Sequence, residues 1–251
     1  MTASSSELTT RLVAKPARFR LDRYDLRARL FPALLVALPL PISIASLAPG
    51  VGPVWASIWG LICYAGGTLF IVRLARDSGK RLEEGLFLKW GGRPATRLLR
   101  HRDAPNKIVL FRYHHRLATL IPGLRLPSAR EELLDPRNAD DVYDSAVKLL
   151  IARTRGDRLL FEENCNYGFT RNLLGLRTLG RTVSTSMLAI LLVQSGRTLF
   201  AGSLGAGLVT GTAVVSVLCA AWWMLVNEDL VRRASQAYAE RLLETLDRTD
   251  L

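Results

Sequence analysis

The sequence LFPALLVALPLPISIASLAP, residues 30–49, carries no charged side chain. A helix needs about 20 predominantly apolar residues to cross a hydrocarbon core that is roughly 30 Å thick, and this stretch has that length. Two further uncharged stretches, residues 51–72 and 198–227, also meet it. Each of the three is therefore predicted to be a transmembrane helix.

A fourth uncharged stretch, residues 182–196, is short for a span. It reaches the required length if residues 173–179 extend it, with the guanidinium groups of Arg177 and Arg181 reaching the lipid headgroups. The sequence then predicts an all-α integral membrane protein with four transmembrane helices. They form two hairpins with a helical cytosolic domain between them.

The composition agrees with this class of protein. The chain has 251 residues, a net charge of +12 and 49% hydrophobic residues, figures that conflict for a soluble domain unless the apolar residues gather in spans. The first stretch is not expected to be a cleaved signal peptide, because it follows a long basic segment and a second span comes at once. Cys63, Cys165 and Cys219 lack metal-ligand spacing, so we expect no disulfide framework, metal or cofactor.

The distribution of Lys and Arg predicts the topology, because short loops rich in these residues stay on the cytosolic side. Residues 1–29 carry seven Lys/Arg against three acidic residues and residues 75–181 carry 21 against 13, whereas the two outer turns contain only Arg197. We therefore expect a multi-pass protein of the bacterial inner (cytoplasmic) membrane with both termini cytosolic. The predicted units are a basic segment at 1–29, hairpins at 30–74 and 177–227, a basic helical domain at 75–176 and an amphipathic C-terminal helix at 228–251.

The first span is predicted to be kinked and to follow a helix that lies on the membrane. The arginines at 18, 20, 23, 27 and 29 alternate with apolar residues, and anchoring on anionic lipid explains them without a nucleic acid. Pro32, Pro39 and Pro41 each remove a backbone donor, which a membrane tolerates only if neighbouring groups satisfy the freed carbonyls.

The spans also bear on function. Gly207 and Gly211 form a GxxxG pair, which favours close helix packing within a chain or in a homo-oligomer. No ionisable residue lies at the centre of a predicted span, which argues against a secondary transporter. A channel remains possible, since hydroxyl side chains or an apolar constriction can line a pore.

The cytosolic domain is predicted to be helical throughout. Residues 76–87 continue the second span as a stalk, and Ser128 with Glu131 forms a capping-box pattern. Further helices are expected at 107–121, 140–153 and 161–176. The 140–153 helix is expected to bury Val142, Ala146, Leu149 and Leu150. A returning helix at 229–246, with Val231, Tyr238, Leu242 and Leu246 on one face, is expected to dock on this domain or on its counterpart in a neighbouring subunit.

Residues 90–102, WGGRPATRLLRHR, are the most unusual stretch. A Gly-Gly turn followed by Arg93, Arg97 and Arg100 is predicted to place three guanidinium groups on one helical face near a helix N-terminus, where phosphate binds well. It is not a P-loop, because the Lys-Ser/Thr pair is absent. The alternative is an arginine helix that faces lipid headgroups.

A second candidate segment is residues 162–172, EENCNYGFTRN. Tyr167 and Phe169 are suited to stacking on a base and Arg171 to pairing with a phosphate. The alternative is that Glu162 and Glu163 pair with arginines of the stalk and hold the domain against the bilayer. His114 and His115 are expected to lie in solvent or at an interface, because adjacent histidines on a helix cannot form a metal pair. We expect no catalytic site.

Two membrane hairpins around a basic helical domain, together with the WGGRP segment at 90–94 and the NYGF segment at 166–169, resemble small membrane effectors of bacterial anti-phage systems. The similarity is to the transmembrane effector of Hailong-type systems, which is paired with a nucleotidyltransferase. It implies an oligomeric channel gated by a nucleotide or single-stranded oligonucleotide. The residues expected to bind it are Arg93, Arg97, Arg100, Arg102, Tyr167, Phe169 and Arg171. A non-conducting scaffold that recruits an acidic protein or anionic lipid is the alternative.

Overall fold

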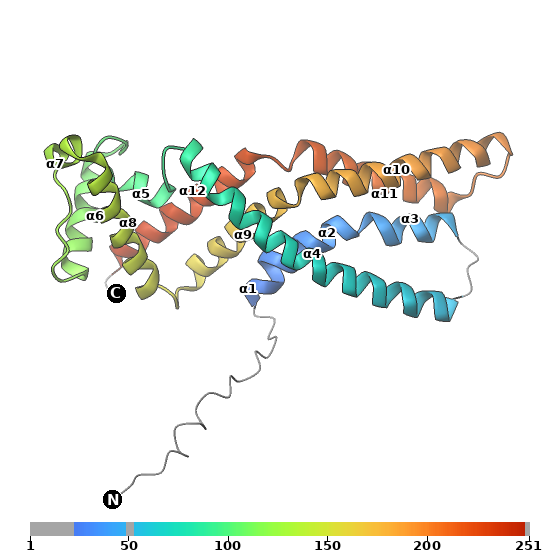
Figure 1. The fold of residues 1–251 in the computed structure, drawn as a ribbon, viewed down its shortest axis with the longest axis horizontal. Coiled ribbons are helices and arrows are strands. Elements are labelled where there is room, and N and C mark those ends of the chain that lie inside the picture. The colour runs from blue at the N-terminus through green and yellow to red at the C-terminus, as the bar shows by residue number, and fades with distance from the viewer. Residues whose placement is uncertain (1–22, 49–52, 249–251) are drawn as a thin grey trace, which may run out of the picture.

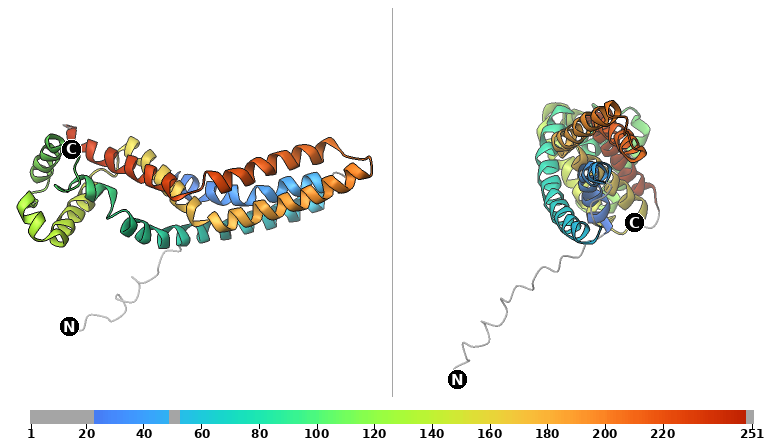
Figure 2. Two further views of the ribbon diagram at one scale, coloured as in Figure 1. Left: turned by 90° about the horizontal axis from the view of Figure 1, so that it is seen from above. Right: turned by 90° about the vertical axis from the view of Figure 1, so that its right-hand side faces the viewer.

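A computed structural model describes residues 23–48 and 53–248, without the side chains of 53–65 and 68. Within those residues every regular element is a helix, which confirms the predicted all-α class. The molecule is elongated, with long helices side by side at one end and short helices gathered at the other (Figures 1 and 2). The predicted membrane anchor at Arg18 and Arg20, and the first outer turn, lie outside the described residues.

Among the residues described, three helical stretches are long and apolar enough to cross a membrane: Arg23–Leu47, Arg177–Phe200 and Ala206–Met224. The first comprises α1 (Arg23–Asp25), η2 (Leu26–Leu30), α2 (Phe31–Ala37) and α3 (Pro39–Leu47), and the others are α10 and α11. The remaining predicted span is the N-terminal part of α4 (Pro53–Lys89), whose side chains are largely outside the description. The four-span arrangement as two hairpins therefore stays a prediction.

The turn between α10 and α11 was predicted at Arg197, and this is wrong. Helix α10 continues to Phe200, and Gly202 follows it with a φ of 67°. The amide of Gly202 donates to the carbonyl of Leu199 and that of Ser203 to the carbonyl of Thr198, a Schellman end. A glycine in the left-handed region, and not a charged residue, ends the helix, so α10 extends past Arg197 to Phe200. At its other end α10 begins at Arg177 as a helix separate from α9.

Proline shapes the first span as expected. Pro32 has no amide to donate to the carbonyl of Ala28, and residues Leu26–Leu30 form a π-helix at this point. The side-chain amide of Asn172 donates to the Ala28 carbonyl instead, at 2.6 Å. A neighbouring helix thus satisfies the freed carbonyl.

Helix α4 continues beyond the predicted span to Lys89, which confirms the stalk as a helix. It crosses α9 (Arg158–Gly175) at Gly79 and Gly175, where a Cβ on Gly175 would lie 2.7 Å from the amide nitrogen of Gly79. The other helices are α5 (Pro94–Leu98), α6 (Lys107–Leu120), α7 (Ala129–Leu134), α8 (Pro136–Arg153), α12 (Glu228–Glu244) and the short η3 (Thr245–Asp247).

The core at the far end joins α5, α6, α8 and the returning α12. Leu99, Leu117, Leu150 and Leu242 are fully buried in it, so the predicted docking of the C-terminal helix is confirmed. The capping box of Ser128 and Glu131 is also present. On α8 one prediction is wrong.

Leu149, expected in the core, is 45% exposed, and Tyr143 and Val147 are buried instead. Val142, also expected in the core, is half-buried. The buried face of α8 comprises Ala139, Tyr143, Ala146, Val147 and Leu150, which repeat with helical spacing, so the prediction placed the apolar face slightly out of register. The Tyr143 hydroxyl on this face reaches a buried carboxylate, as described below.

Candidate ligand-binding cleft and its arginine network

The arginines of residues 90–102 do not share one helical face, contrary to the prediction. Helix α5 ends at Leu98, and Arg93 precedes it as the N-cap residue. Arg100, beyond the helix, is 6% exposed and bonds Asp140 of α8 through Nε at 2.7 Å and Nη2 at 2.8 Å. It turns inward because a carboxylate of α8 receives it in bidentate geometry.

The Gly-Gly turn serves this buried arginine. Gly91 and Gly92 have φ values of 77° and 129°, and a Cβ on Gly92 would lie 2.5 Å from Nη2 of Arg100. The carbonyl of Gly91 accepts a hydrogen bond from Nη1 of Arg100 at 2.6 Å. The Gly-Gly turn thus covers the guanidinium group of Arg100.

Arg102 belongs to a second network around Glu132 of α7, whose side chain is 2% exposed. The carboxylate accepts hydrogen bonds from the backbone amides of His101 and Arg102, from the Tyr143 hydroxyl and from Arg102 Nη1, at 2.7–3.1 Å. Burial alone would raise the pKa of Glu132, but these donors outweigh it and the pKa is lowered. Glu132 is therefore a structural anion that ties the loop after α5 to α7 and α8.

The two remaining arginines of this segment are held less tightly. Arg97 Nε lies 3.5 Å from Asp103, and Arg93 Nε lies 4.0 Å from Asp144. Every arginine predicted for phosphate in this segment thus has a carboxylate partner. Phosphate binding by these residues stays a prediction, but a ligand would have to displace a carboxylate at each.

The second predicted segment lies on α9 and is largely internal. Tyr167 is 8% exposed, its ring stacks on Tyr238 of α12 with centroids 6.3 Å apart, and its hydroxyl donates to Glu83 of the stalk at 2.7 Å. Arg171 Nη1 lies 2.9 Å from the same carboxylate. Tyr167 therefore has no free face for a base, and Phe169 is half-buried against the same core.

The alternative for this segment, ion pairs from Glu162 to stalk arginines, is also corrected. Glu162 pairs with Arg27 of η2. The stalk does pair with α9, but with the signs reversed, since the stalk supplies Glu83 and α9 supplies Arg171. That this segment holds the domain against the bilayer stays a prediction.

The histidines of α6 lie apart from any cluster of metal-ligating side chains in the described residues. Within residues 23–48 and 53–248, no group of three or more His, Cys, Asp or Glu side chains is placed to hold a metal ion. His115 is exposed as expected, but His114 is half-buried, with Nε2 2.8 Å from the carbonyl oxygen of Leu99 and its ring edge-on to His101. Burial lowers the pKa of His114 against the opposing effect of that hydrogen bond.

This shift predicts acid sensitivity. The pKa of His114 in the folded state lies below its ordinary value of 6.5. The contribution of His114 to the free energy of unfolding is therefore complete above pH 6.5, and it is lost as the pH decreases toward the pKa of the folded state. The slope should not exceed about 1.4 kcal/mol per pH unit. Urea unfolding at several pH values checks it: His114→Phe should flatten the dependence and His115→Phe should not. An unchanged slope in His114→Phe would contradict the assignment.

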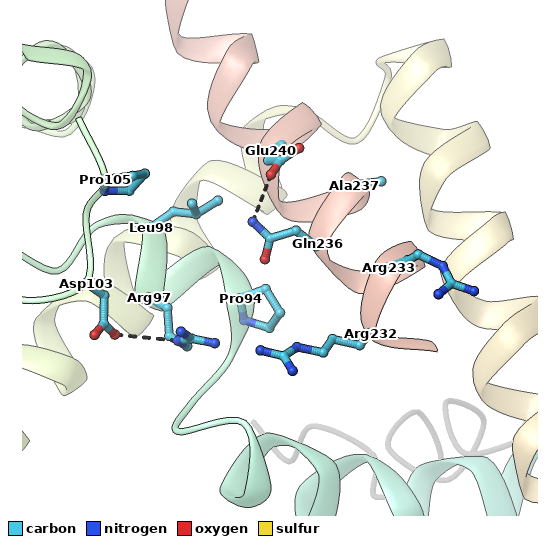
Figure 3. Close-up of a pocket in the computed structure, with 10 residues that line it drawn as sticks. All are labelled: Pro94, Arg97, Leu98, Asp103, Pro105, Arg232, Arg233, Gln236, Ala237 and Glu240. Carbon is cyan, nitrogen blue, oxygen red and sulfur yellow. Dashed lines mark hydrogen bonds and ion pairs between the residues drawn. The ribbon is translucent and has the colours of Figure 1, made fainter. Parts of the chain in front are cut away.

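A cleft of about 510 Å³ lies between α5 and α12 (Figure 3). We call it the α5–α12 cleft. Arg97 and Arg232 approach it from the two helices with Pro94 between them. Arg233 also contributes to the lining, with its guanidinium group pointing away from these two arginines. The other lining residues are Leu98, Asp103, Pro105, Gln236, Ala237 and Glu240.

Sequence reasoning missed Arg232 and Arg233. In the part of the chain that the structure describes, no carboxylate oxygen lies within 4.0 Å of a guanidinium nitrogen of either arginine. Their signal was a pair of adjacent arginines on the polar face of an amphipathic helix. Only the return of α12 along α5 places Arg232 opposite Arg97.

The predicted GxxxG pair is divided between two environments. A Cβ on Gly211 would collide with the side chain of Ser46 on α3, so this glycine permits close packing within the chain. A Cβ on Gly207 would meet nothing within 4 Å. A role of Gly207 between subunits stays a prediction.

No family model matches this chain, and no curated protein or solved structure is significantly similar to it.

Proposed function

We propose that the chain is an oligomeric membrane effector, an ion channel or pore whose conductance is set by a phosphate-bearing ligand on its cytosolic domain. A nucleotide or single-stranded oligonucleotide made by a nucleotidyltransferase partner, in anti-phage defence, is the ligand that the resemblance implies. The protein would lie in the bacterial inner membrane with both termini cytosolic.

The observation that carries it is the direct connection of cytosolic helices to spans. Helix α4 runs from the predicted second span into the cytosolic domain, α9 meets α10 at Leu176, and α11 meets α12 through residues 225–227. A displacement in the cytosolic domain is therefore passed to the spans by short or continuous helical links. Such links suit a protein in which a ligand shifts the balance between two packings of the spans.

The three links meet in one buried cluster. Glu83 of α4 accepts hydrogen bonds from Arg171 and Tyr167 of α9, and Tyr167 stacks on Tyr238 of α12. A ligand that favours one arrangement of α5 and α12 changes the surroundings of this cluster. Glu83 is thus the residue whose charge should couple the cytosolic domain to the spans.

The first experiment measures ion flux through liposomes that contain the purified chain, with and without cyclic nucleotides and short oligonucleotides. Flux that changes with one of them would support a gated channel. Absence of flux under every condition, from folded and inserted protein, would contradict it.

Glu83→Gln tests the coupling. It keeps the shape of the side chain but removes the charge that Arg171 and Tyr167 share, so we expect the ratio of flux with and without ligand to fall about fivefold, the low end of allosteric coupling. The matched control is Glu84→Gln, the adjacent exposed carboxylate of the same helix, which should leave the ratio unchanged. Equal effects of the two variants would contradict coupling through Glu83.

One observation favours the alternative of a non-conducting scaffold. The far end of the cytosolic domain exposes apolar side chains of α6 and α7, each at least three-quarters accessible to solvent: Ile108, Phe111, Leu133 and Leu134. Exposed apolar side chains of this kind are typical of protein contacts. Binding of a partner without flux would favour the scaffold.

A further inference from the structure

The α5–α12 cleft differs from the rest of the arginine network in the charge that it offers to a ligand. Arg100 donates a bidentate pair of hydrogen bonds to a carboxylate, and Arg102 donates hydrogen bonds to two carboxylates. Neither arginine lines this cleft. Arg97 and Arg232 do line it, from opposite walls, and Arg233 also contributes to the lining. Against these three cations the cleft has two carboxylates, Asp103 and Glu240.

Arg97 can change its partner at low cost. Its Nε is 3.5 Å from Asp103, a long contact, whereas the same carboxylate receives Nη1 of Arg100 at 2.9 Å. If Arg97 turns to a ligand, Asp103 keeps its shorter bond to Arg100. No buried charge is then left without a partner, which is the condition that makes breaking an ion pair expensive.

The neighbouring cavity that contains Arg93 is a poor competitor. It measures about 590 Å³, but Glu84, Asp140, Asp141 and Asp144 line it together with Arg93 and Arg100. Both arginines there face more carboxylates than they can balance, so an anion is repelled. Among the described cavities that contain predicted arginines, the α5–α12 cleft is the one with an excess of cations.

We infer that the α5–α12 cleft binds a phosphate or diphosphate group, held between Arg97 and Arg232, with Arg233 adding positive charge nearby. Guanidinium groups suit phosphate because they donate paired hydrogen bonds in a planar fork. Pro94, Leu98 and Ala237 supply apolar surface for the rest of the ligand, and the volume lies within the range of small-molecule sites.

The site also connects a ligand to two spans. Its α5 wall follows α4 through the Gly91-Gly92 turn, and its α12 wall follows α11 through residues 225–227. A phosphate between Arg97 and Arg232 therefore bridges the extensions of two membrane helices. The inference rests on the proposed function, since it gives that function's ligand a place, but its test measures binding and not conductance.

The phosphate has two possible sources, a soluble ligand or a lipid headgroup. Both offer the same chemistry to Arg97 and Arg232, and α12 begins four residues after α11 ends, close to the membrane surface. Nanodiscs of neutral phosphatidylcholine and nanodiscs that also contain anionic phosphatidylglycerol separate the two. With a lipid headgroup in the cleft, anionic nanodiscs weaken the binding of a soluble probe; with a soluble ligand, the probe binds equally in both.

The experiment is a calorimetric titration of pyrophosphate into the full chain in neutral nanodiscs. We expect saturable binding that Arg97→Gln and Arg232→Gln each weaken about tenfold, the loss of one hydrogen-bonded charge. Arg130→Gln, which removes an exposed arginine of α7 far from the cleft, is the matched control and should change the affinity less than twofold. Glu240→Gln removes a carboxylate from the cleft and should tighten binding about twofold.

Two results would contradict a phosphate site in the α5–α12 cleft. Absence of saturable pyrophosphate binding in neutral nanodiscs would contradict the site. A loss of affinity in Arg130→Gln equal to that in Arg232→Gln would show that pyrophosphate is attracted by the overall positive charge of the protein and not by the cleft. Thermal unfolding of each variant checks that it is folded, and Arg232 is exposed, so its replacement should leave the fold intact. A chain that binds pyrophosphate here but passes no ions would keep the site and remove the channel.

Discussion

Glu132→Ala is expected to lower the free energy of unfolding of the helical domain that contains α5–α8 and α12 by about 3–5 kcal/mol. The carboxylate is buried and accepts hydrogen bonds from two backbone amides, the Tyr143 hydroxyl and the Arg102 guanidinium. Its removal leaves the two amides, the hydroxyl and Nη1 of Arg102 without this acceptor, whereas Nη2 of Arg102 keeps Asp140. Chemical unfolding followed by circular dichroism measures the loss, and hydrogen exchange of the amides in α7 and α8 locates it.

The matched control is the adjacent Glu131→Gln. Glu131 is exposed, and glutamine can keep its place in the capping box with Ser128. The ion pair with Arg125 is exposed to solvent, so its loss should have little effect on stability. A loss in Glu132→Ala no larger than in Glu131→Gln would show that the network around Glu132 does not stabilise the domain.

Gly175→Ala should produce the second large effect, a loss of about 1–3 kcal/mol. Its Cβ would lie 2.7 Å from the amide nitrogen of Gly79 and 3.1 Å from the Cα of the same residue. Since both atoms belong to the backbone, no side chain can turn away, and α4 and α9 must separate. Thermal unfolding of the full chain in detergent measures the loss.

Gly85→Ala is the comparison for this prediction. Gly85 lies on α4, six residues after Gly79, but a Cβ there would meet nothing within 4 Å. Alanine also favours a helix over glycine by about 1 kcal/mol, so stability should stay equal or rise slightly. If Gly175→Ala is as well tolerated as Gly85→Ala, the helices do not cross at this point as closely as described.

The helices of this chain were predictable because their signals are local. Ser128 and Glu131 lie within one helical turn of each other, and Pro122 and Gly123 end α6 where expected. The apolar face of α12 repeats with helical period, and its burial follows from that pattern. Such signals are complete within a short window, whatever the rest of the chain does.

The use of the arginines was not predictable in the same way. Arg100 meets Asp140, 40 residues along the chain, and Arg171 meets Glu83, 88 residues away. The charge of each arginine is visible in the sequence, but its partner is not. Predictions that treated these side chains as free for phosphate therefore overlooked the carboxylates that other helices bring to them.

The sequence by itself determined that the chain is helical, where α6 and α12 begin and end to within two residues, and which stretches are apolar enough to cross a membrane. The tertiary structure alone decided which arginines are engaged and that Arg232 faces Arg97 across a cleft. The reason is physical: helix formation and apolar burial depend on near neighbours and periodicity, whereas ion pairs act between atoms a few ångströms apart. Distant segments come within that range only when the helices pack.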